Sequence, residues 1–110
     1  MKPRRGDVFM AKMDAPVDDV IGGFRPVVVV SNNKGNKSST ICIVVPMRTT
    51  ARRYFPTHVV VQASGDGVAM CENVTTISQH RLDRKVATLT EKEMQQIDAA
   101  LAVAVGLENL

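Results

Sequence analysis

The chain has 110 residues, of which 45% are hydrophobic and 23% charged, a composition typical of a single globular domain. No run approaches the roughly 18 apolar residues of a membrane span, and no apolar segment follows the basic start. We therefore expect one domain over residues 1–110, no membrane association and a cytoplasmic location. Cys42 and Cys71 show no CxxC spacing and there are no clustered histidines, so we expect reduced, partly buried thiols rather than a disulfide or a zinc site.

The net charge of +3 is unevenly distributed along the chain. Residues 1–53 hold ten Lys and Arg against four Asp, or +6, whereas residues 54–110 hold four against seven acidic residues, or −3. A basic half beside an acidic half is consistent with contact with a polyanion through one face. A chance imbalance on a solvated surface is the alternative.

The first two thirds of the chain predicts short β-strands. β-Branched residues dominate seven apolar runs, and branching at Cβ favours a pleated, packed surface. Turn-forming residues separate the runs, among them a turn expected over residues 32–36. Closely spaced strands of this kind predict a small barrel or sandwich. The seven runs are residues 8–11, 26–30, 41–45, 58–61, 67–71, 74–77 and 85–89.

The last part of the chain predicts an α-helix. Thr90 and Glu93 have the spacing of a capping box, and Gly106 is a natural stop. Apolar residues recur between them at helical spacing and predict a stripe that faces the core, formed by Met94, Ile97, Leu101 and Val105. Residues 78–82 are expected to add a short helical turn. The predicted architecture is a β-barrel with a C-terminal helix.

The sequence lacks the motifs of serine hydrolases, P-loop proteins and zinc proteases, and it has no clustered acidic set for two-metal chemistry. We therefore expect neither a metal nor a cofactor. RNA carries its own nucleophile, the 2′-hydroxyl, so an enzyme that cleaves it has only to orient the chain, neutralise phosphate charge and move protons. Arg25 follows Gly22 and Gly23 at a strand entrance, and its planar fork of donors suits a phosphate.

Five segments, in this order, together resemble one known family over about residues 4–107. They are RGDVF from Arg5, GGFRPVVVVSN from Gly22, PTHV from Pro56, ENVTTI from Glu72 and LTEKEM from Leu89. The family is that of the MazF/PemK (mRNA interferase) toxins of bacterial toxin–antitoxin pairs. The resemblance implies a small SH3-like β-barrel with a C-terminal helix, as in the MazF, PemK and CcdB toxins. It also implies a homodimer that a MazE-like antitoxin neutralises.

For function, the resemblance implies a sequence-selective, metal-independent endoribonuclease that cleaves single-stranded RNA. Attack by the 2′-hydroxyl would leave a 2′,3′-cyclic phosphate and a 5′-hydroxyl. Arg25 corresponds to the family's catalytic Arg. The second catalytic residue of the family is a Thr or Ser, but Arg48 stands at that position here, and a one-residue shift of the loop would bring Thr49 into it.

Candidate RNA contacts surround this position. Arg48, Arg52, Arg53 and Tyr54 lie between the third and fourth predicted strands, where Arg holds phosphate and Tyr stacks on a base. An exposed, solvated loop is the alternative. Two further candidates are His58, for which a structural role at the strand entrance is as compatible with the sequence, and Arg81.

Two other functions compete with the nuclease. One is a non-enzymatic growth inhibitor of the same fold that binds a protein such as DNA gyrase, because one fold supports many functions. The other is a nuclease-like protein that binds RNA without cutting it. The GGFRP segment favours the nuclease, and the displaced Thr is the strongest argument against it.

Overall fold

The computed structural model describes residues 2–49, 55–62 and 67–109. Most elements of this part of the chain are strands, with a short helix after the second strand, a longer one at the end, and two 3₁₀ turns, η1 and η2, that flank β6. The elements are β1 (Asp7–Lys12), β2 (Phe24–Val29), α1 (Asn33–Ser38), β3 (Ile41–Arg48), β4 (His58–Val61), β5 (Gly67–Met70), η1 (Cys71–Asn73), β6 (Thr75–Ser78), η2 (Gln79–Arg81), β7 (Leu82–Thr88) and α2 (Glu91–Ala104).

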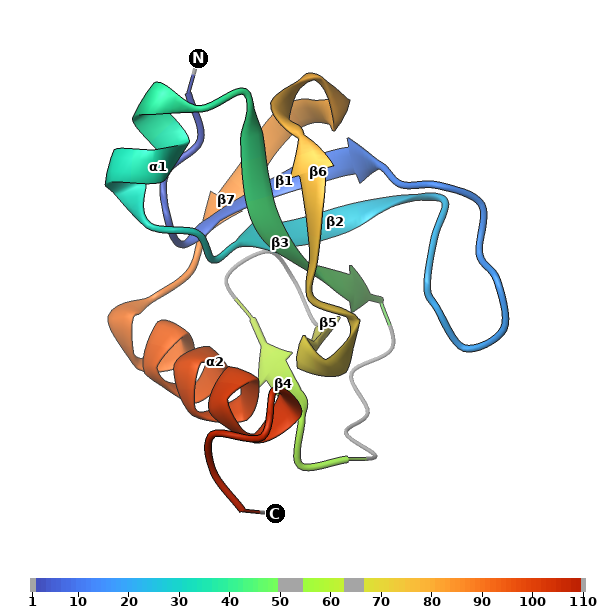
Figure 1. Ribbon diagram of the computed structural model, residues 1–110, viewed down its shortest axis with the longest axis vertical. Helices are drawn as coiled ribbons and strands as arrows, with labels where there is room; N and C mark the ends of the chain where they lie inside the picture. The colour runs from blue at the N-terminus through green and yellow to red at the C-terminus, as the bar shows by residue number, and fades with distance from the viewer. Residues whose placement is uncertain (1, 50–54, 63–66, 110) are drawn as a thin grey trace.

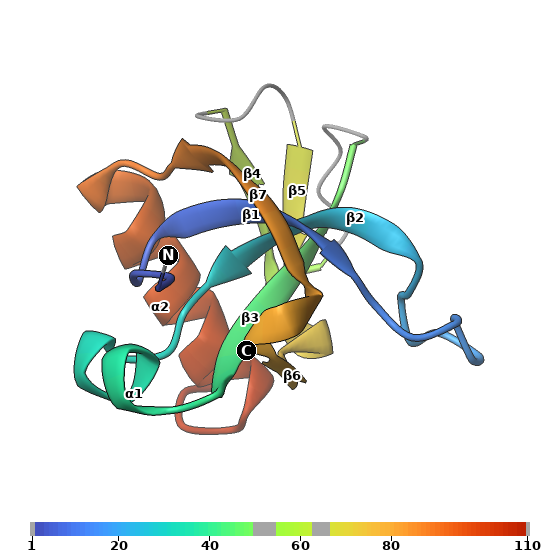
Figure 2. The same cartoon turned by 90° about the horizontal axis from the view of Figure 1, so that it is seen from above.

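The strands form one antiparallel sheet in the order β4-β5-β3-β2-β1-β7, and β6 pairs with β3 beside β5. η2 connects β6 to β7 across the opening, so the sheet bends round into a small barrel (Figure 1). Helix α2 lies on one side of the barrel, and the β1–β2 loop projects from the other (Figure 2). This architecture confirms the predicted mainly β, SH3-like fold with a C-terminal helix.

Two apolar clusters lie on opposite faces of the central strands. Val28 and Val45 are paired across β2 and β3 and belong to the helix core, which also contains Ile97 of α2. Val29 and Val44, the next pair, belong to the barrel core, which is enclosed by the curved sheet. Because successive strand residues point to opposite faces, the unbroken valine runs serve two cores at once.

Helix α2 begins as its sequence predicts. The Thr90 hydroxyl accepts a hydrogen bond from the Glu93 amide at 3.1 Å, and the Glu93 carboxylate accepts one from the Thr90 amide at 3.0 Å. At the other end Gly106 has φ +80°, a left-handed conformation that glycine adopts without strain. The predicted core stripe is wrong at its last member, because Val105 lies at the helix end and is 58% exposed.

Helix α1 was not expected, because residues 32–36 read as a turn. The Asn32 side chain caps the helix by accepting a hydrogen bond from the Gly35 amide at 2.7 Å. Asn36 is buried, and its side-chain amide donates to the Ser31 carbonyl at 2.9 Å. The helix is therefore anchored by polar groups, and hydrophobic periodicity does not reveal it.

β3 and β7 extend furthest beyond their predicted ranges, because each gains pairing with a neighbouring strand. β3 continues three residues past its predicted end, where Met47 and Arg48 pair with Ala69 and Val68 of β5. β7 begins at residue 82, three residues early, because it pairs with β1 along its length.

Within the described residues, no helix has the length and apolar character needed to cross a membrane.

The position of Ile97 predicts a large stability effect. Its side chain has no exposed area and packs in the helix core, so Ile97→Ala is expected to lower the free energy of unfolding by about 2–5 kcal/mol. Urea denaturation measures this difference. Gln95→Ala, on the exposed side of the same helix, is the control and should change stability by less than about 0.5 kcal/mol. Equal effects of the two substitutions would contradict the placement of α2.

Candidate active site

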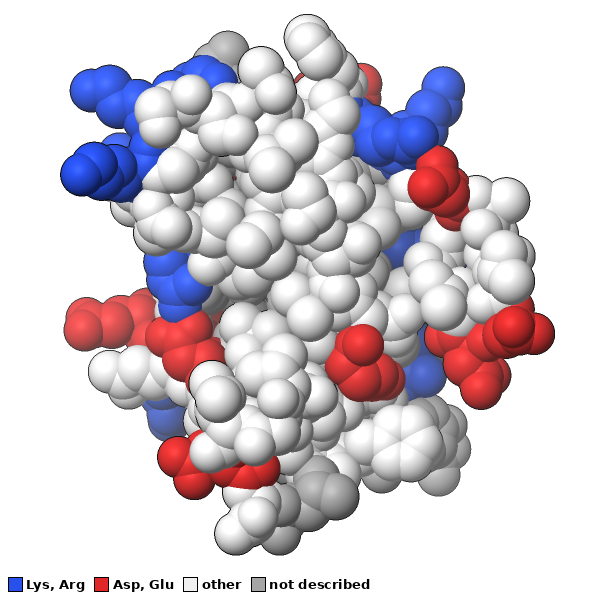
Figure 3. All heavy atoms as spheres, viewed as in Figure 1, with Lys and Arg blue, Asp and Glu red and all other residues white. Residues whose placement is uncertain are grey.

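Charge gathers in separate regions of the surface (Figure 3). Lys and Arg cluster over α1 and the N-terminal segment, while Asp and Glu lie over α2 and the β1–β2 loop. The acidic residues of this loop, Asp14, Asp18 and Asp19, belong to the basic half of the sequence. The two halves of the chain therefore do not map onto one basic and one acidic face.

Arg25 lies at the start of β2, and two backbone carbonyls fix its guanidinium. Nε donates to the Gly22 carbonyl at 2.7 Å, and Nη1 donates to the Met47 carbonyl at 3.2 Å. Gly22 itself is packed so closely that a Cβ there would lie 2.0 Å from the Asp14 carbonyl oxygen. Partial burial lowers the pKa of Arg25 through desolvation, but an arginine remains charged at physiological pH. The Arg25 guanidinium is thus held by hydrogen bonds next to the end of β3.

Arg48 lies on the same face of the sheet as Arg25. Val27 pairs with Pro46 and Val29 with Val44, so Arg25 at the start of β2 and Arg48 at the end of β3 lie toward the same end of these neighbouring strands. Counting by two from Val29 and Val44 of the barrel core places both arginines on the barrel-core side. Two cationic side chains therefore face the same space from neighbouring strands.

The predicted one-residue shift does not occur within β3. The strand runs through Arg48 without a bulge, and Arg48 keeps its pairing with Val68. Thr49, which follows, is exposed and lines a hollow of about 260 Å³ together with Met47. The other residues of this hollow are Met10, Pro26, Arg48, Gly67 and Val86. Arg48, not Thr49, is the last residue of the strand.

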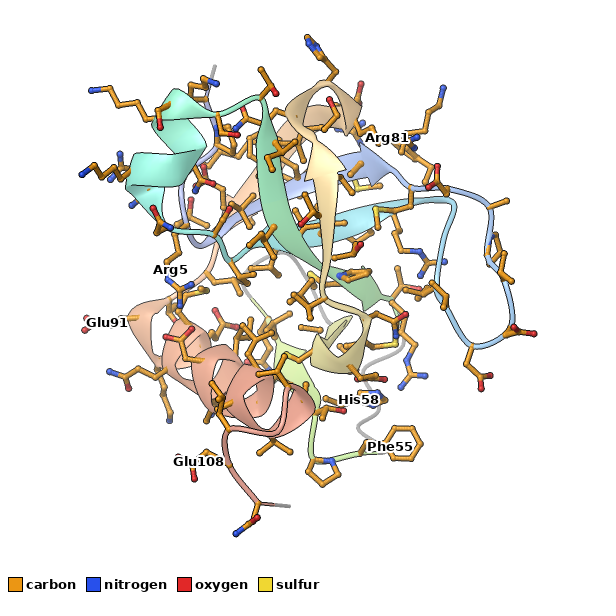
Figure 4. All side chains as sticks on the ribbon, in the orientation of Figure 1. Arg5, Phe55, His58, Arg81, Glu91 and Glu108 are labelled. Carbon is orange, nitrogen blue, oxygen red and sulfur yellow. The ribbon has the colours of Figure 1, made fainter. Side chains whose placement is uncertain are left out.

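His58 is held in a buried ion pair at the start of β4. Its Nε2 lies 2.7 Å from a Glu72 carboxylate oxygen, and the ring is 3% exposed. The second Glu72 oxygen accepts a hydrogen bond from the Thr57 hydroxyl at 2.8 Å, and the Phe55 ring packs edge-on against the imidazole at 5.0 Å (Figure 4). The buried ring fits the structural role that the sequence left open, and direct RNA contact by His58 stays a prediction.

The residue after Glu72 links this cluster to the loop that carries Gly22. The Asn73 side-chain oxygen accepts a hydrogen bond from the Ile21 amide at 3.0 Å. Gly22 follows Ile21 directly and supplies the carbonyl that holds Arg25. A chain of contacts thus runs from η1 to Arg25. Sequence analysis found Glu72 and Asn73 only as part of a family motif, since nothing in their spacing indicated this link.

Arg81 lies far from His58, near the opposite end of the molecule (Figure 4). Its guanidinium donates to the Lys12 carbonyl at 2.9 Å and forms an ion pair with Asp14 at 2.8 Å. The two residues predicted to contact RNA are therefore not brought together. Arg52, Arg53 and Tyr54 of the predicted RNA-binding loop lie outside the described residues.

The remaining expectations concern metals and thiols. No group of three or more His, Cys, Asp or Glu that suits a metal ion occurs among residues 2–49, 55–62 and 67–109. Cys42 and Cys71 are free and buried, which confirms the prediction of reduced thiols. Burial raises the pKa of Cys42 to about 11, and burial together with the charges of Glu72 and Asp98 raises that of Cys71 to about 12. Both thiols are therefore poor nucleophiles at neutral pH.

The Glu72 contacts predict a pH-dependent contribution to stability. Desolvation raises the pKa of Glu72, but hydrogen bonds from His58, its own backbone and Thr57, together with the His58 charge, outweigh this and lower it below its ordinary value of 4.5. A lowered folded-state pKa contributes stability at neutral pH that is lost as pH falls through that pKa. The stability difference between the parent and Glu72→Gln should therefore shrink towards zero on acidification, as measured by urea denaturation at several pH values. A difference that grows on acidification would contradict the pairing.

Comparisons with known proteins agree with this geometry. Residues 4–105 match the family model described as PemK-like, MazF-like toxin of type II toxin-antitoxin system. The chain is 35% identical to the endoribonuclease MazF of Staphylococcus epidermidis, covering 96% of this chain and 93% of that protein. It is 33% identical to the endoribonuclease MazF of Staphylococcus saprophyticus, with 97% and 94% covered.

A solved structure has the same fold. It is an endoribonuclease in complex with its cognate antitoxin from a mycobacterial species, with a TM-score of 0.83, 30% identity and coverage of 96% of this chain and 97% of that one. The barrel, the cation held after a Gly-Gly turn and the match over nearly the whole chain lead to one conclusion: this chain belongs to the PemK-like, MazF-like family of type II toxin–antitoxin toxins.

Proposed function

We propose that this toxin is a sequence-selective endoribonuclease that cleaves single-stranded RNA, and that Arg25 and Arg48 bind the phosphate of the cleaved step. The observation that carries the proposal is the placement of these two cations on one face of neighbouring strands. A phosphate bound between two cations accepts charge-assisted hydrogen bonds from both. The family and its endoribonuclease relatives support RNA as the source of the phosphate.

The reaction requires no group beyond the substrate and protein side chains. The 2′-oxygen attacks the adjacent phosphorus and loses its proton, the bond from phosphorus to the 5′-oxygen breaks, and the 5′-oxygen gains a proton. The products are a 2′,3′-cyclic phosphate and a 5′-hydroxyl. Arg25 uses two of its five N–H groups on backbone carbonyls, which leaves three to bind the phosphate as its charge increases.

Thr49 is the proposed hydroxyl partner. It directly follows Arg48, at the point where the chain leaves the sheet and the strand no longer fixes its side-chain direction. A hydroxyl can donate a hydrogen bond to the departing 5′-oxygen, whereas Arg48 neutralises charge but is a poor proton carrier. Arg52, Arg53 and Tyr54 continue the RNA contact along the following loop. Arg81 can bind RNA only if its ion pair with Asp14 breaks.

The proposed partners follow from the family. We expect a homodimer in the cytoplasm that a MazE-like antitoxin inhibits. The related endoribonuclease solved with its cognate antitoxin supports the antitoxin as a partner. The alternative of a gyrase-binding inhibitor is not favoured, because the relatives are endoribonucleases. A protein that binds RNA without cutting it would retain affinity but give no products.

The first test is cleavage of a long single-stranded RNA in excess EDTA. We expect cutting to persist, because the substrate supplies the nucleophile and Arg25 supplies the charge. Mass spectrometry of the fragments should find cyclic phosphates at the new 3′ ends and hydroxyls at the new 5′ ends. Loss of cleavage on chelation that a divalent ion restores would rule out this mechanism.

The second test separates the roles of the three site residues by single-turnover kinetics with saturating enzyme. Arg25→Ala should abolish turnover. Thr49→Ala should slow cleavage of bound RNA by about 10²-fold, because a contact made in the transition state is lost. Arg48→Ala should weaken binding more than it slows the bound complex.

The control for the hydroxyl is Thr40→Ala, which removes an exposed threonine at the opposite end of β3. This variant should cleave at the parental rate. If Thr49→Ala also did so, the hydroxyl would have to come from another residue, and Thr50 would be tested next.

A further inference from the structure

A second basic site lies away from Arg25, between the N-terminal segment and α1. It is a groove of about 510 Å³ lined by Lys2, Pro3, Arg4, Asn33, Lys34 and Lys37. Four of these six residues are cationic and none is acidic. The positive region over α1 and the chain start is visible on the surface (Figure 3).

The groove cations have no carboxylate partner among the described residues, in contrast to four other cations of the chain. Arg5, Arg81, Arg84 and Lys85 each lie within 4 Å of an Asp carboxylate. In the part of the chain that the structure describes, no such ion pair involves the side chains of Arg4, Lys34 or Lys37, and Lys2 donates only to neutral oxygens of Ser39 and Gln79. Their mutual repulsion is therefore not neutralised within the fold, and an anion that entered the groove would relieve it.

The two walls of the groove are tied together by hydrogen bonds. The Lys2 amino group donates to the Ser39 carbonyl at 2.7 Å, just beyond α1. The Arg5 amide donates to the Asn33 side chain at 2.6 Å, and the Arg5 guanidinium contacts the Val30 carbonyl and Asp98. The cations are thus attached to a formed surface, so less ordering is required when a ligand binds.

The groove lies too far from Arg25 to contact the same phosphate. The two are connected along β2, whose residues from Arg25 to Val29 span about 13 Å, and α1 begins only at Asn33. Views from two directions place α1 and the β1–β2 loop on opposite sides of the barrel (Figures 1 and 2). Only a strand that extends several nucleotides beyond the cleaved step can reach both sites.

We propose that this groove binds backbone phosphates of the RNA substrate outside the cleaved step; the proposal rests on the endoribonuclease function above. The groove offers cations and an amide but no aromatic ring, so it recognises charge rather than bases. It therefore adds affinity for long RNA without adding sequence preference. An acidic protein segment is the other polyanion that fits such a surface, and the experiment distinguishes it.

The experiment compares binding of two RNAs that contain the cleavage site, of roughly 6 and roughly 24 nucleotides, the short one close to the minimum length of a single-strand site. A 2′-deoxy nucleotide at the cleaved step removes the nucleophile, so binding is measured without cutting. Lys34→Ala combined with Lys37→Ala should weaken binding of the long RNA by about tenfold or more at about 50 mM salt. The slope of log affinity against log salt should become shallower by about 1.4, since each single-strand contact contributes about 0.7.

The short RNA should show neither effect, so the ratio of long-RNA to short-RNA affinity should fall. The matched control is Arg84→Ala combined with Lys92→Ala, which removes the same charge from exposed positions outside the groove. This control should keep the parental slope. Lys34→Arg combined with Lys37→Arg keeps the charge and should also keep the slope, and thermal melting checks that each variant is folded.

Three results would overturn the proposal: equal slopes for the two alanine pairs, equal losses for the long and the short RNA, or loss of affinity for an acidic peptide with RNA binding intact. The nuclease function is tested separately, because cleavage of the unmodified long RNA by the parent protein does not involve the variants. If the parent bound RNA through the groove but did not cut it, the nuclease function would fail while the groove assignment stood.

Discussion

The arrangement of this toxin depends on how β3 is paired. One edge of β3 pairs with β2, while the other is shared, with residues 41–44 paired to β6 and residues 47–48 to β5. A single strand therefore belongs both to the closed barrel and to the smaller layer under α2. Because its side chains alternate, Val44 contributes to the barrel core and Val45 to the helix core. The same alternation, continued to the strand end, decides which face Arg48 occupies.

The candidate site contains two arginines, Arg25 and Arg48, on neighbouring strands. Arg25 is fixed by carbonyls from the loop before it and from β3, so its orientation is set before any substrate arrives. Arg48 lies on the same face of the neighbouring strand β3. The hydrogen bond from the Ile21 amide to the Asn73 side chain also holds the loop that contains Gly22. Such preorganised charge suits a reaction in which negative charge increases on phosphate.

Charge is distributed to suit a long polyanion. Acidic residues lie on the β1–β2 loop and on α2, and basic residues gather over α1 and the N-terminal segment. Under the proposed function, a substrate is bound by its backbone in one place and cut in another. Selectivity for sequence would then come from the cleavage site, and affinity for long RNA from the groove beside α1.

The apolar runs and turns indicated most of the strands and a small barrel or sandwich, and the capping residues indicated where α2 starts and stops, because these features depend on residues close together in the chain. The family resemblance then favoured the SH3-like barrel. Arg25 as a site residue was likewise readable from GGFRP. Helix α1 was not, since buried polar contacts of Asn32 and Asn36 stabilise it. Nor was the partner of His58, which comes from an element 14 residues away, or the face of Arg48, which depends on the pairing of β3 with two other strands. Contacts between residues distant in sequence are set only when the chain packs, and they decide which side chains share the site.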